Sequence, residues 1–188
     1  MRAFFAIELP DPVRVHLARV QAAIADLDLK AAKPIPQDNL HITVKFLGTI
    51  DPKKVDELAE SLQLMHRPGA VMLQAQDLEC FPLRGPIRIV GADVGGDLTP
   101  LLALHKAVEQ RCQYLGFAAE ARGFRPHVTL ARAKSGLPPS TRQALAAACQ
   151  PLWPGPTFTV THLMLMQSIL RQEGAEYRAV RAFALQPG

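Results

Sequence analysis

Hydrophobic and polar positions alternate with two different periods along this chain, and the two periods mark strands and helices. Short apolar or alternating runs predict strands over residues 2–9, 41–47, 70–78, 87–94, 124–131, 158–167 and 177–185. Apolar residues spaced by three or four positions predict helices over residues 12–27, 52–65, 98–115 and 139–149. The order of these elements predicts an α+β fold.

Two of the predicted helices have recognisable starts. Pro12 opens the first helix, whose apolar face carries Val13, Leu17, Val20 and Ile24. Asp51 is expected to cap the second helix, which Pro52 opens and whose apolar face carries Val55, Leu58, Leu62 and Met65.

One short pattern occurs twice, each time as a histidine, an aliphatic residue, a threonine and a second aliphatic residue. The copies are His41-Ile42-Thr43-Val44 and His127-Val128-Thr129-Leu130. In a strand, successive side chains point to opposite faces, so each histidine shares a face with its threonine while the aliphatic residues pack into a core. Two imidazoles and two hydroxyls on one polar floor could hold a phosphate and move protons around it.

The spacing of the two copies predicts a molecule of two similar lobes. They lie 86 positions apart (from 41 to 127), and each strand is followed by a helix and further strands. Each lobe is expected to be an antiparallel sheet flanked by helices, with the active-site groove between the lobes. No Pro-, Gly- or Ser-rich linker divides them, so residues 1–188 are expected to form a single two-lobed domain.

A structural role is the alternative for each histidine taken alone, because a histidine in a strand is often a hydrogen-bonded structural residue. Two features favour the functional interpretation for the pair. Both copies have polar and aliphatic residues in the same phase, and loop-like sequence precedes each of them, at 34–39 and at 122–126. Residues that enter a strand from a loop commonly line clefts.

Composition narrows the class of protein. With 48% hydrophobic and 20% charged residues, the chain fits a folded globular protein with a substantial core. The apolar run at the N-terminus is too short for a signal peptide, and no stretch reaches membrane-spanning length, so we expect a cytoplasmic protein away from membranes. Cys80, Cys112 and Cys149 lack metal-binding or disulfide spacing and are expected to be packing residues. The net charge of +4 is compatible with an anionic partner.

The sequence resembles the two-histidine (2H) phosphoesterases, and within them the RNA 2′,3′-cyclic phosphodiesterases once described as 2′-5′ RNA ligases. The resemblance runs nearly end to end. It covers the opening strand at 2–10, the first motif at 39–48, the second at 124–132, and a closing hairpin with Gln167-Ser168-Ile169-Leu170, Gly174 and Tyr177. One departure is that members often carry an aromatic residue, typically Trp, in the strand occupied here by residues 87–91.

Two histidines suffice for opening a 2′,3′-cyclic phosphate, since water must lose a proton and the departing ribose oxygen must gain one. One imidazole can be neutral and the other charged near neutral pH, because the ordinary pKa is about 6.5. Thr43 and Thr129 would donate hydrogen bonds to the non-bridging oxygens. The resemblance implies that His41 is the proton donor, that His127 is the proton acceptor, and that a 2′-phosphate is left. No metal or other cofactor is required.

Three further residues are candidates for binding substrate. Arg132 and Arg125 could contact phosphate or the RNA backbone, and Phe46 could stack on a base. Strict alternation places Arg132 and Phe46 on the opposite face from the histidines, so a bulge or a strand end is needed to turn them into the groove. Lys45 has the right phase but is equally well a solvated strand residue. We expect the other four histidines, His16, His66, His105 and His162, to be surface or structural residues.

The resulting hypothesis is a monomeric hydrolase that acts in RNA processing on RNA or nucleotides with 2′,3′-cyclic phosphate ends. Three alternatives remain: 2′-5′ RNA ligation, in which a ribose hydroxyl replaces water; a non-catalytic RNA- or nucleotide-binding module of the same fold; and a metallohydrolase. Retention of both motifs argues against the binding module. A zinc site needs at least a third protein ligand at suitable spacing, and no motif such as His-x-x-x-His is present.

Overall fold

The computed structural model describes residues 1–65, 67–121, 123–172 and 174–186. The helices are α1 (Asp11–Ala25), α2 (Lys54–Gln63), α3 (Leu98–Tyr114) and α4 (Thr141–Cys149), with short 3-10 turns at Gln37–Asn39 and Gln150–Leu152. The strands are β1 (Arg2–Glu8), β2 (Ala32–Pro34), β3 (His41–Thr49), β4 (Val71–Phe81), β5 (Ile87–Gly96), β6 (His127–Leu137), β7 (Thr157–Val160), β8 (His162–Arg171) and β9 (Gly174–Ala184). The predicted α+β class, with antiparallel strands and flanking helices, is confirmed.

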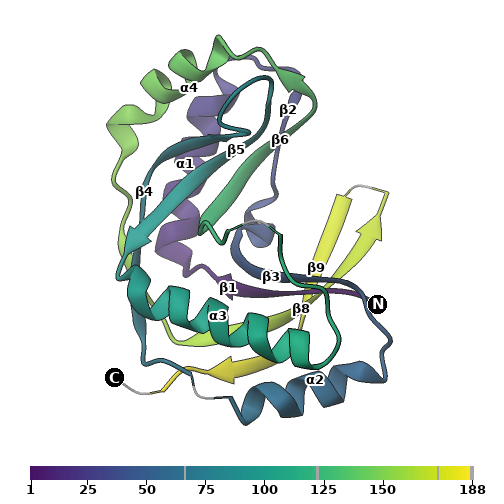
Figure 1. Ribbon diagram of the computed structural model, residues 1–188. Coiled ribbons are helices and arrows are strands. Elements are labelled where there is room, and N and C mark those ends of the chain that lie inside the picture. The colour runs from purple at the N-terminus through teal and green to yellow at the C-terminus, as the bar shows by residue number, and fades with distance from the viewer. Residues whose placement is uncertain (66, 122, 173, 187–188) are drawn as a thin grey trace.

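One curled sheet contains the strands of both lobes (Figure 1). Within the described residues its order is β7-β4-β5-β6-β3-β1-β8-β9, and β2 pairs with residues 131–133 of β6 on the edge opposite β5. The first lobe is β3, β1, β8 and β9, and the second is β7, β4, β5, β6 and β2. The lobes join where β3 meets β6, through the single register pair Ile42 and Val128.

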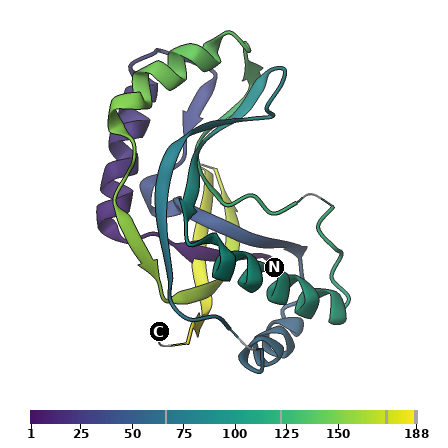
Figure 2. The ribbon, with the colours of Figure 1, turned by 60° about the vertical axis from the view of Figure 1, so that its left-hand side comes forward.

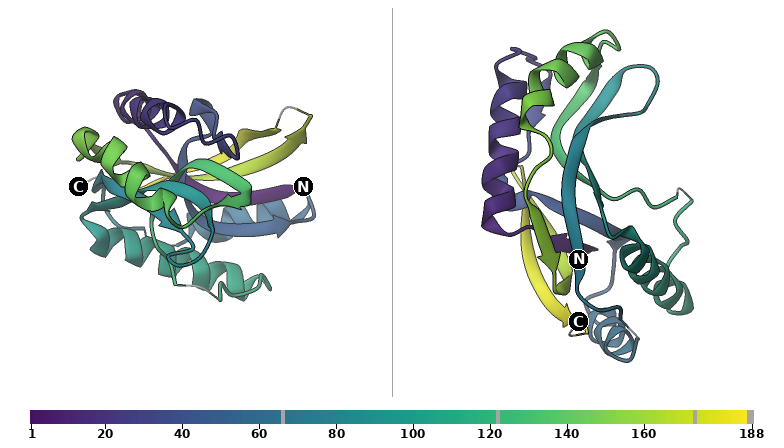
Figure 3. Two further views of the ribbon diagram at one scale, coloured as in Figure 1. Left: turned by 90° about the horizontal axis from the view of Figure 1, so that it is seen from above. Right: turned by 90° about the vertical axis from the view of Figure 1, so that its left-hand side faces the viewer.

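Two helices connect the lobes. Helix α1 follows β1 of the first lobe but packs against β6 and α4, whereas α3 follows β5 of the second lobe and packs against β4 of that lobe and against β3 and α2 of the first. Figures 2 and 3 show α1 and α4 together along one side, and α2 and α3 together at the opposite end. Helix α1 therefore covers the lobe that its preceding strand does not belong to, and α3 spans both lobes.

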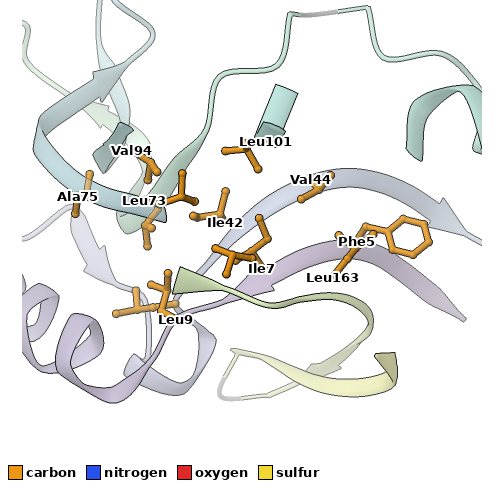
Figure 4. Packing of buried hydrophobic residues seen from close by; sticks show 14 of the residues in the cluster. Phe5, Ile7, Leu9, Ile42, Val44, Leu73, Ala75, Val94, Leu101 and Leu163 are labelled. Atoms are coloured by element: carbon orange, nitrogen blue, oxygen red, sulfur yellow. The ribbon is translucent and has the colours of Figure 1, made fainter. Parts of the chain in front are cut away.

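The main hydrophobic core lies between the sheet and these helices. Its buried side chains include Phe5, Ile7, Ile42, Leu101 and Leu163, which converge from four elements in Figure 4. A second, smaller cluster lies on the other side of β1 and contains Phe4, Ala6 and Met166, with Met164 and Tyr177 packed against it. Strand β1 is thus covered on both faces, which explains its continuous apolar run.

Most expected elements are found within a few residues of their predicted bounds, but the strand expected over 124–131 runs from His127 to Leu137, two other elements are corrected, and one strand is new. The strand expected over 158–167 is two strands, because the chain leaves β4 after β7 and joins β1 as β8. Strand β2 was not expected. The second helix begins at Lys54, and the Asp51 carboxylate accepts a hydrogen bond from the Lys53 N–H at 2.9 Å, so Asp51 caps the turn before the helix.

Two smaller expectations concern the cysteines and membranes. Cys112 and Cys149 are buried in the main core and Cys80 is packed against it, as predicted. Burial raises the pKa of the Cys112 thiol to about 12 and that of Cys149 to about 11. In the described part of the chain, no helix combines the length and hydrophobicity needed to cross a membrane.

Candidate active site

The two His-x-Thr motifs begin neighbouring strands. His41 is the first residue of β3 and His127 is the first residue of β6, and these strands pair through the residue that follows each histidine. Ile42, Val44, Val128 and Leu130 are buried in the core, whereas the histidines and threonines are half-buried. The predicted division into a polar face and a core face is confirmed for both motifs.

The two imidazoles are anchored in the same way. The Nδ1 atom of His41 lies 2.7 Å from the carbonyl oxygen of Asn39, and that of His127 lies 2.9 Å from the carbonyl oxygen of Arg125. A carbonyl only accepts hydrogen bonds, so Nδ1 carries the proton in both rings. Each neutral ring therefore keeps Nε2 as its basic nitrogen.

The surroundings of His41 disfavour its charged form. Its ring centroid lies 5.0 Å from that of Phe4 and 5.2 Å from that of Tyr177, which meets it edge-on. Burial lowers the pKa of His41, and the nearby positive charges of Arg132 and His127 lower it further, against an opposing effect of the hydrogen bond to Asn39. The neutral ring accepts a hydrogen bond from the Thr43 hydroxyl, with Nε2 and Oγ1 2.9 Å apart.

His127 has a more open environment. Its ring centroid lies 5.0 Å from that of Phe81 in β4. Phe81 pairs across strands with Ile89, within the segment where related proteins were expected to have an aromatic residue. In this chain the aromatic side chain beside the histidine therefore comes from the neighbouring strand.

A β-bulge follows each threonine and changes the phase of the strand. In β3, Phe5 pairs with Lys45 and Ala6 with Thr43, so Val44 is the extra residue. In β6, Val90 pairs with Ala131 and Gly91 with Thr129, so Leu130 is the extra residue. The two bulges occupy equivalent positions in the two motifs.

The bulges turn Phe46 and Arg132 into the groove, as their proposed roles require. Both side chains are exposed, and both line the hollows on either side of the motifs. The carbonyl of the bulged Leu130 accepts a hydrogen bond from Gln21 Nε2 at 2.9 Å, and the same amide nitrogen lies 2.7 Å from the carbonyl of Ile35. Helix α1 thereby supports the bulge from behind.

The bulge in β3 also corrects the expectation for Lys45, which is not a solvated residue. Its side chain is only 2% exposed, and its Nζ atom lies 2.7 Å from Glu109 Oε2 in α3. It also donates a hydrogen bond to the carbonyl of Ala118 at 3.0 Å. Burial alone would raise the pKa of Glu109, but hydrogen bonds from Lys45, Gln113 and the Glu120 N–H, with the charge of Lys45, lower it to about 2.

The motifs lie at the meeting point of two hollows, with empty volumes of about 960 and 1050 Å³. The residues that line both are Thr43, Phe46, Thr129 and Arg132. The first hollow contains His41 and extends to Arg2, Ser168 and Tyr177, which are cross-strand neighbours on β1, β8 and β9. The second contains His127 and extends to Phe81, His105, Glu120, Phe124 and Arg125.

Arg125 lies in the wall of the second hollow and already has partners there. Its guanidinium pairs with the Glu79 carboxylate and lies 5.5 Å from the centroid of the Phe81 ring. About half of its side chain remains exposed, so it can still face a ligand. A contact between Arg125 and RNA stays a prediction.

The structure adds residues that the motifs did not indicate. Tyr177 and Phe4 enclose His41, and His105 stacks on Phe124 with ring centroids 4.2 Å apart. His105 was expected to lie outside the site because no motif surrounds it, but it lines the second hollow.

Two of the remaining histidines, His16 and His162, lie away from the groove. His16 packs edge-on against Trp153, and His162 is exposed with Nδ1 2.9 Å from the Thr161 hydroxyl. His66 lies outside the described residues. Among those that are described, no group of three or more His, Cys, Asp or Glu side chains is arranged to hold a metal ion.

A curled α+β fold with two equivalent histidine-threonine strands facing one groove defines a two-histidine phosphoesterase. Comparison with known proteins agrees, since the 2′-5′ RNA ligase superfamily matches residues 9–170. The chain belongs to this superfamily.

Curated relatives carry a more specific name. The RNA 2′,3′-cyclic phosphodiesterase of Methanocaldococcus jannaschii is 32% identical over 134 residues, which cover 71% of this chain and 72% of the relative. The RNA 2′,3′-cyclic phosphodiesterase of Aeropyrum pernix is 30% identical over 165 residues, which cover 88% of this chain and 92% of the relative.

Solved structures share the fold over nearly the whole chain. The protein TT0787 of Thermus thermophilus has a TM-score of 0.81 at 25% identity, and the match covers 100% of this chain and 99% of that protein. E. coli LigT in complex with 3′-AMP has a TM-score of 0.71 at 25% identity, and the match covers 98% of this chain and 97% of LigT.

Proposed function

We propose that this protein is an RNA 2′,3′-cyclic phosphodiesterase that hydrolyses cyclic phosphate ends to 2′-phosphates. The observation that carries the proposal is the pair of equivalent motifs, with both imidazoles held through Nδ1 beside one groove. The names of the curated relatives and the 3′-AMP bound to LigT support the choice of substrate.

In the proposed reaction, water attacks phosphorus in line with the departing ribose 3′-oxygen. His127 takes the proton from water as the P–O bond forms, and His41 gives its proton to the 3′-oxygen as the other P–O bond breaks. The product keeps its phosphate on the 2′-oxygen, and the proton count balances because one histidine gains what the other loses. Both steps use Nε2, the nitrogen that the Nδ1 hydrogen bonds leave available.

The threonines and Arg132 stabilise the negative charge on the phosphate. The neutral His41 ring accepts a hydrogen bond from the Thr43 hydroxyl at Nε2, so protonation of Nε2 releases that hydroxyl to donate to a phosphate oxygen and leaves the Nε2–H for the 3′-oxygen. Thr129 occupies the equivalent position in the second motif, and Arg132 lies between the two hollows. These groups oppose the negative charge that grows in the transition state.

Substrate binding also changes the protonation of His41. The free protein favours the neutral ring, yet the proton donor must be charged. A cyclic phosphate brings a negative charge into the groove, and a nearby negative charge raises the pKa of an imidazole. We infer that the substrate itself promotes protonation of its catalytic acid.

The remaining features of the proposal concern the whole chain. Residues 1–188 act as one two-lobed domain, because the groove takes residues from both lobes. The protein works as a monomer in RNA processing, since one chain supplies both histidines. The unpaired thiols of Cys80, Cys112 and Cys149 suit the reducing cytoplasm.

Product analysis tests the function. A cyclic-ended oligonucleotide and a 2′,3′-cyclic mononucleotide are incubated with the protein after exhaustive chelation, and the products are identified by ³¹P NMR. We expect 2′-phosphates, and no turnover by His41→Ala or His127→Ala variants whose melting temperatures match the wild type. Loss of folding in either variant would support structural histidines, and activity restored only by zinc would support a metallohydrolase. Accumulation of 2′-5′ linked products would identify a ligase.

A further inference from the structure

A strip of positive charge leads out of the groove along β2 and β6. Arg132 on β6 pairs across strands with Lys33 on β2, and Lys134 is the next residue of β6 with the same orientation. Directly opposed residues on an antiparallel pair have Cβ atoms about 5 Å apart. Residues two apart on one strand are separated by about 6.6 Å. Arg132, Lys33 and Lys134 are called the basic strip below.

Burial shows that the basic strip lies on the face of β2 and β6 that is turned away from α1. Ala32, Pro34 and Ala131 line a hollow against α1, and Ala133 is buried. Side chains alternate between faces, so Lys33, Arg132 and Lys134 project to the other side. All three residues are exposed, and Arg132 lines both hollows of the candidate active site.

The positive charges of the basic strip are not neutralised within the described residues. The side chains of Lys33, Arg132 and Lys134 form no ion pair or hydrogen bond with another described residue, although the Lys134 carbonyl accepts a hydrogen bond from Arg88. Like charges directly opposite on neighbouring strands destabilise a sheet, so Lys33 beside Arg132 has a small folding cost. Among the other exposed arginines that the structure describes, Arg125, Arg171, Arg178 and Arg181 each have a carboxylate partner, and Arg2, Arg19, Arg84 and Arg88 have none, so it is the position of the basic strip beside the groove that distinguishes it.

We propose that the basic strip binds phosphate groups of the RNA strand that leads to the cyclic end. This inference rests on the proposed function and narrows its substrate class to polynucleotide ends in preference to free cyclic nucleotides. Figure 1 shows β6 running upward from its contact with β3, with β2 beside its upper part, and we infer that the RNA strand follows this path away from the motifs. The phosphates of an RNA strand would neutralise the positive charges of the basic strip, which have no acidic partner among the described residues.

The test compares two substrates with one variant. Lys33→Gln/Lys134→Gln removes two charges and leaves Arg132 and both motifs intact. For a cyclic-ended RNA oligonucleotide we expect KM to rise roughly tenfold and the slope of log KM against log salt to fall by about 1.4, at about 0.7 for each lost contact with a single strand. For a 2′,3′-cyclic mononucleotide, kcat and KM should not change. Lys53→Gln is the matched control, because Lys53 is an exposed lysine at the start of α2. It should change kcat and KM for neither substrate.

Binding separates failure of this inference from failure of the proposed function. Fluorescence anisotropy with a 3′-phosphorylated RNA oligonucleotide measures the contribution of the strip without turnover. Weaker RNA binding by the double variant supports the strip even where neither protein hydrolyses a cyclic phosphate. Equal RNA binding by the double variant and the wild type overturns it, as does an equal loss of activity on both substrates. Matching melting temperatures establish that the variant is folded.

Discussion

Individual side chains in the groove have unequal environments although the motifs are equivalent in sequence. His41 is enclosed by aromatic rings and close to Arg132, whereas His127 is at the more open hollow. The motif alone could not reveal this difference, because Phe4, Tyr177 and Phe81 come from other strands. The unequal environments and the threonines beside them can each be tested by changing one side chain.

The first test concerns the pH dependence of hydrolysis. The pKa of His41 lies below the ordinary 6.5, so His41 becomes protonated only at a lower pH than a free histidine. Because hydrolysis requires charged His41, kcat/KM should decrease as the pH rises through this lowered pKa. Arg132→Gln removes one positive charge and should move this limb of the kcat/KM profile to higher pH, whatever its effect on the maximum. Arg125→Gln is the control, since Arg125 does not contribute to the shift of His41. If this limb of the kcat/KM profile lay at the same pH in both variants, the assignment of His41 as the proton donor would be contradicted.

The second test concerns the threonines. Thr43→Val and Thr129→Val preserve shape but remove a hydroxyl, and loss of one donor to a developing charge typically lowers kcat by about 10². Steady-state kinetics on a cyclic mononucleotide measure this effect, and urea unfolding verifies that stability is retained. A variant with full activity would remove that threonine from the proposed mechanism.

At the scale of elements, the bulges in β3 and β6 decide which residues enter the groove. They place Phe46 and Arg132 beside the motifs and turn Lys45 into the interior, where it joins β3 to α3 and to the segment before β6. The Lys45–Glu109 pair thus connects the first motif to the segment that carries Phe124 and Arg125.

Breaking this pair should destabilise the protein. Lys45→Met leaves the Glu109 carboxylate, 14% exposed, without its cation, and removal of one partner from a buried pair costs about 3 kcal/mol of unfolding free energy. Urea denaturation measures the loss. Lys45→Met/Glu109→Leu should recover much of the stability, because it leaves no unpaired charge. If Lys45→Met were as stable as the wild type, solvent would already stabilise the charge of the Glu109 carboxylate.

Regular alternation made the strands and the polar face of each motif predictable from sequence. A bulge leaves little signal, and Lys45 even occupies the position where strict alternation expects a groove residue. The division of residues 158–167 at Thr161 was hidden as well, because no turn-forming residue separates β7 from β8 and only the partners of the two strands differ. Strand β2 is too short for any period, and it contains Pro34.

At the scale of the whole molecule, the lobes are interdependent. Helix α1 follows a strand of the first lobe and covers the second, α3 packs against strands of both lobes, and the sheet is continuous across the narrow contact of β3 with β6. The two-lobed pattern was visible in the repeat of the motif. The packing of helices across the lobes was not, because either helix has an apolar face that suits either lobe.

This arrangement predicts the effect of removing the last two strands. A chain ending at residue 160 keeps both histidines and both threonines but loses β8, the partner of β1. Phe5 and Ile7 would lose part of their cover, so we expect no cooperative thermal transition and no hydrolysis. Circular dichroism against temperature measures the first and product analysis the second. A cooperative transition in the truncated chain would show that the lobes are less dependent than the contacts indicate.

The pairing of β1 with β8 also sets an order of events during translation. The ribosome releases β1 and β3 early, but the open edge of β1 waits for residues 162–171, some 160 positions later, before it is covered. Nascent chains at any earlier stage expose an apolar strand edge and lack Tyr177 beside His41. If translation stops before this point, the released chain is a substrate for chaperones and proteases and has no activity on RNA.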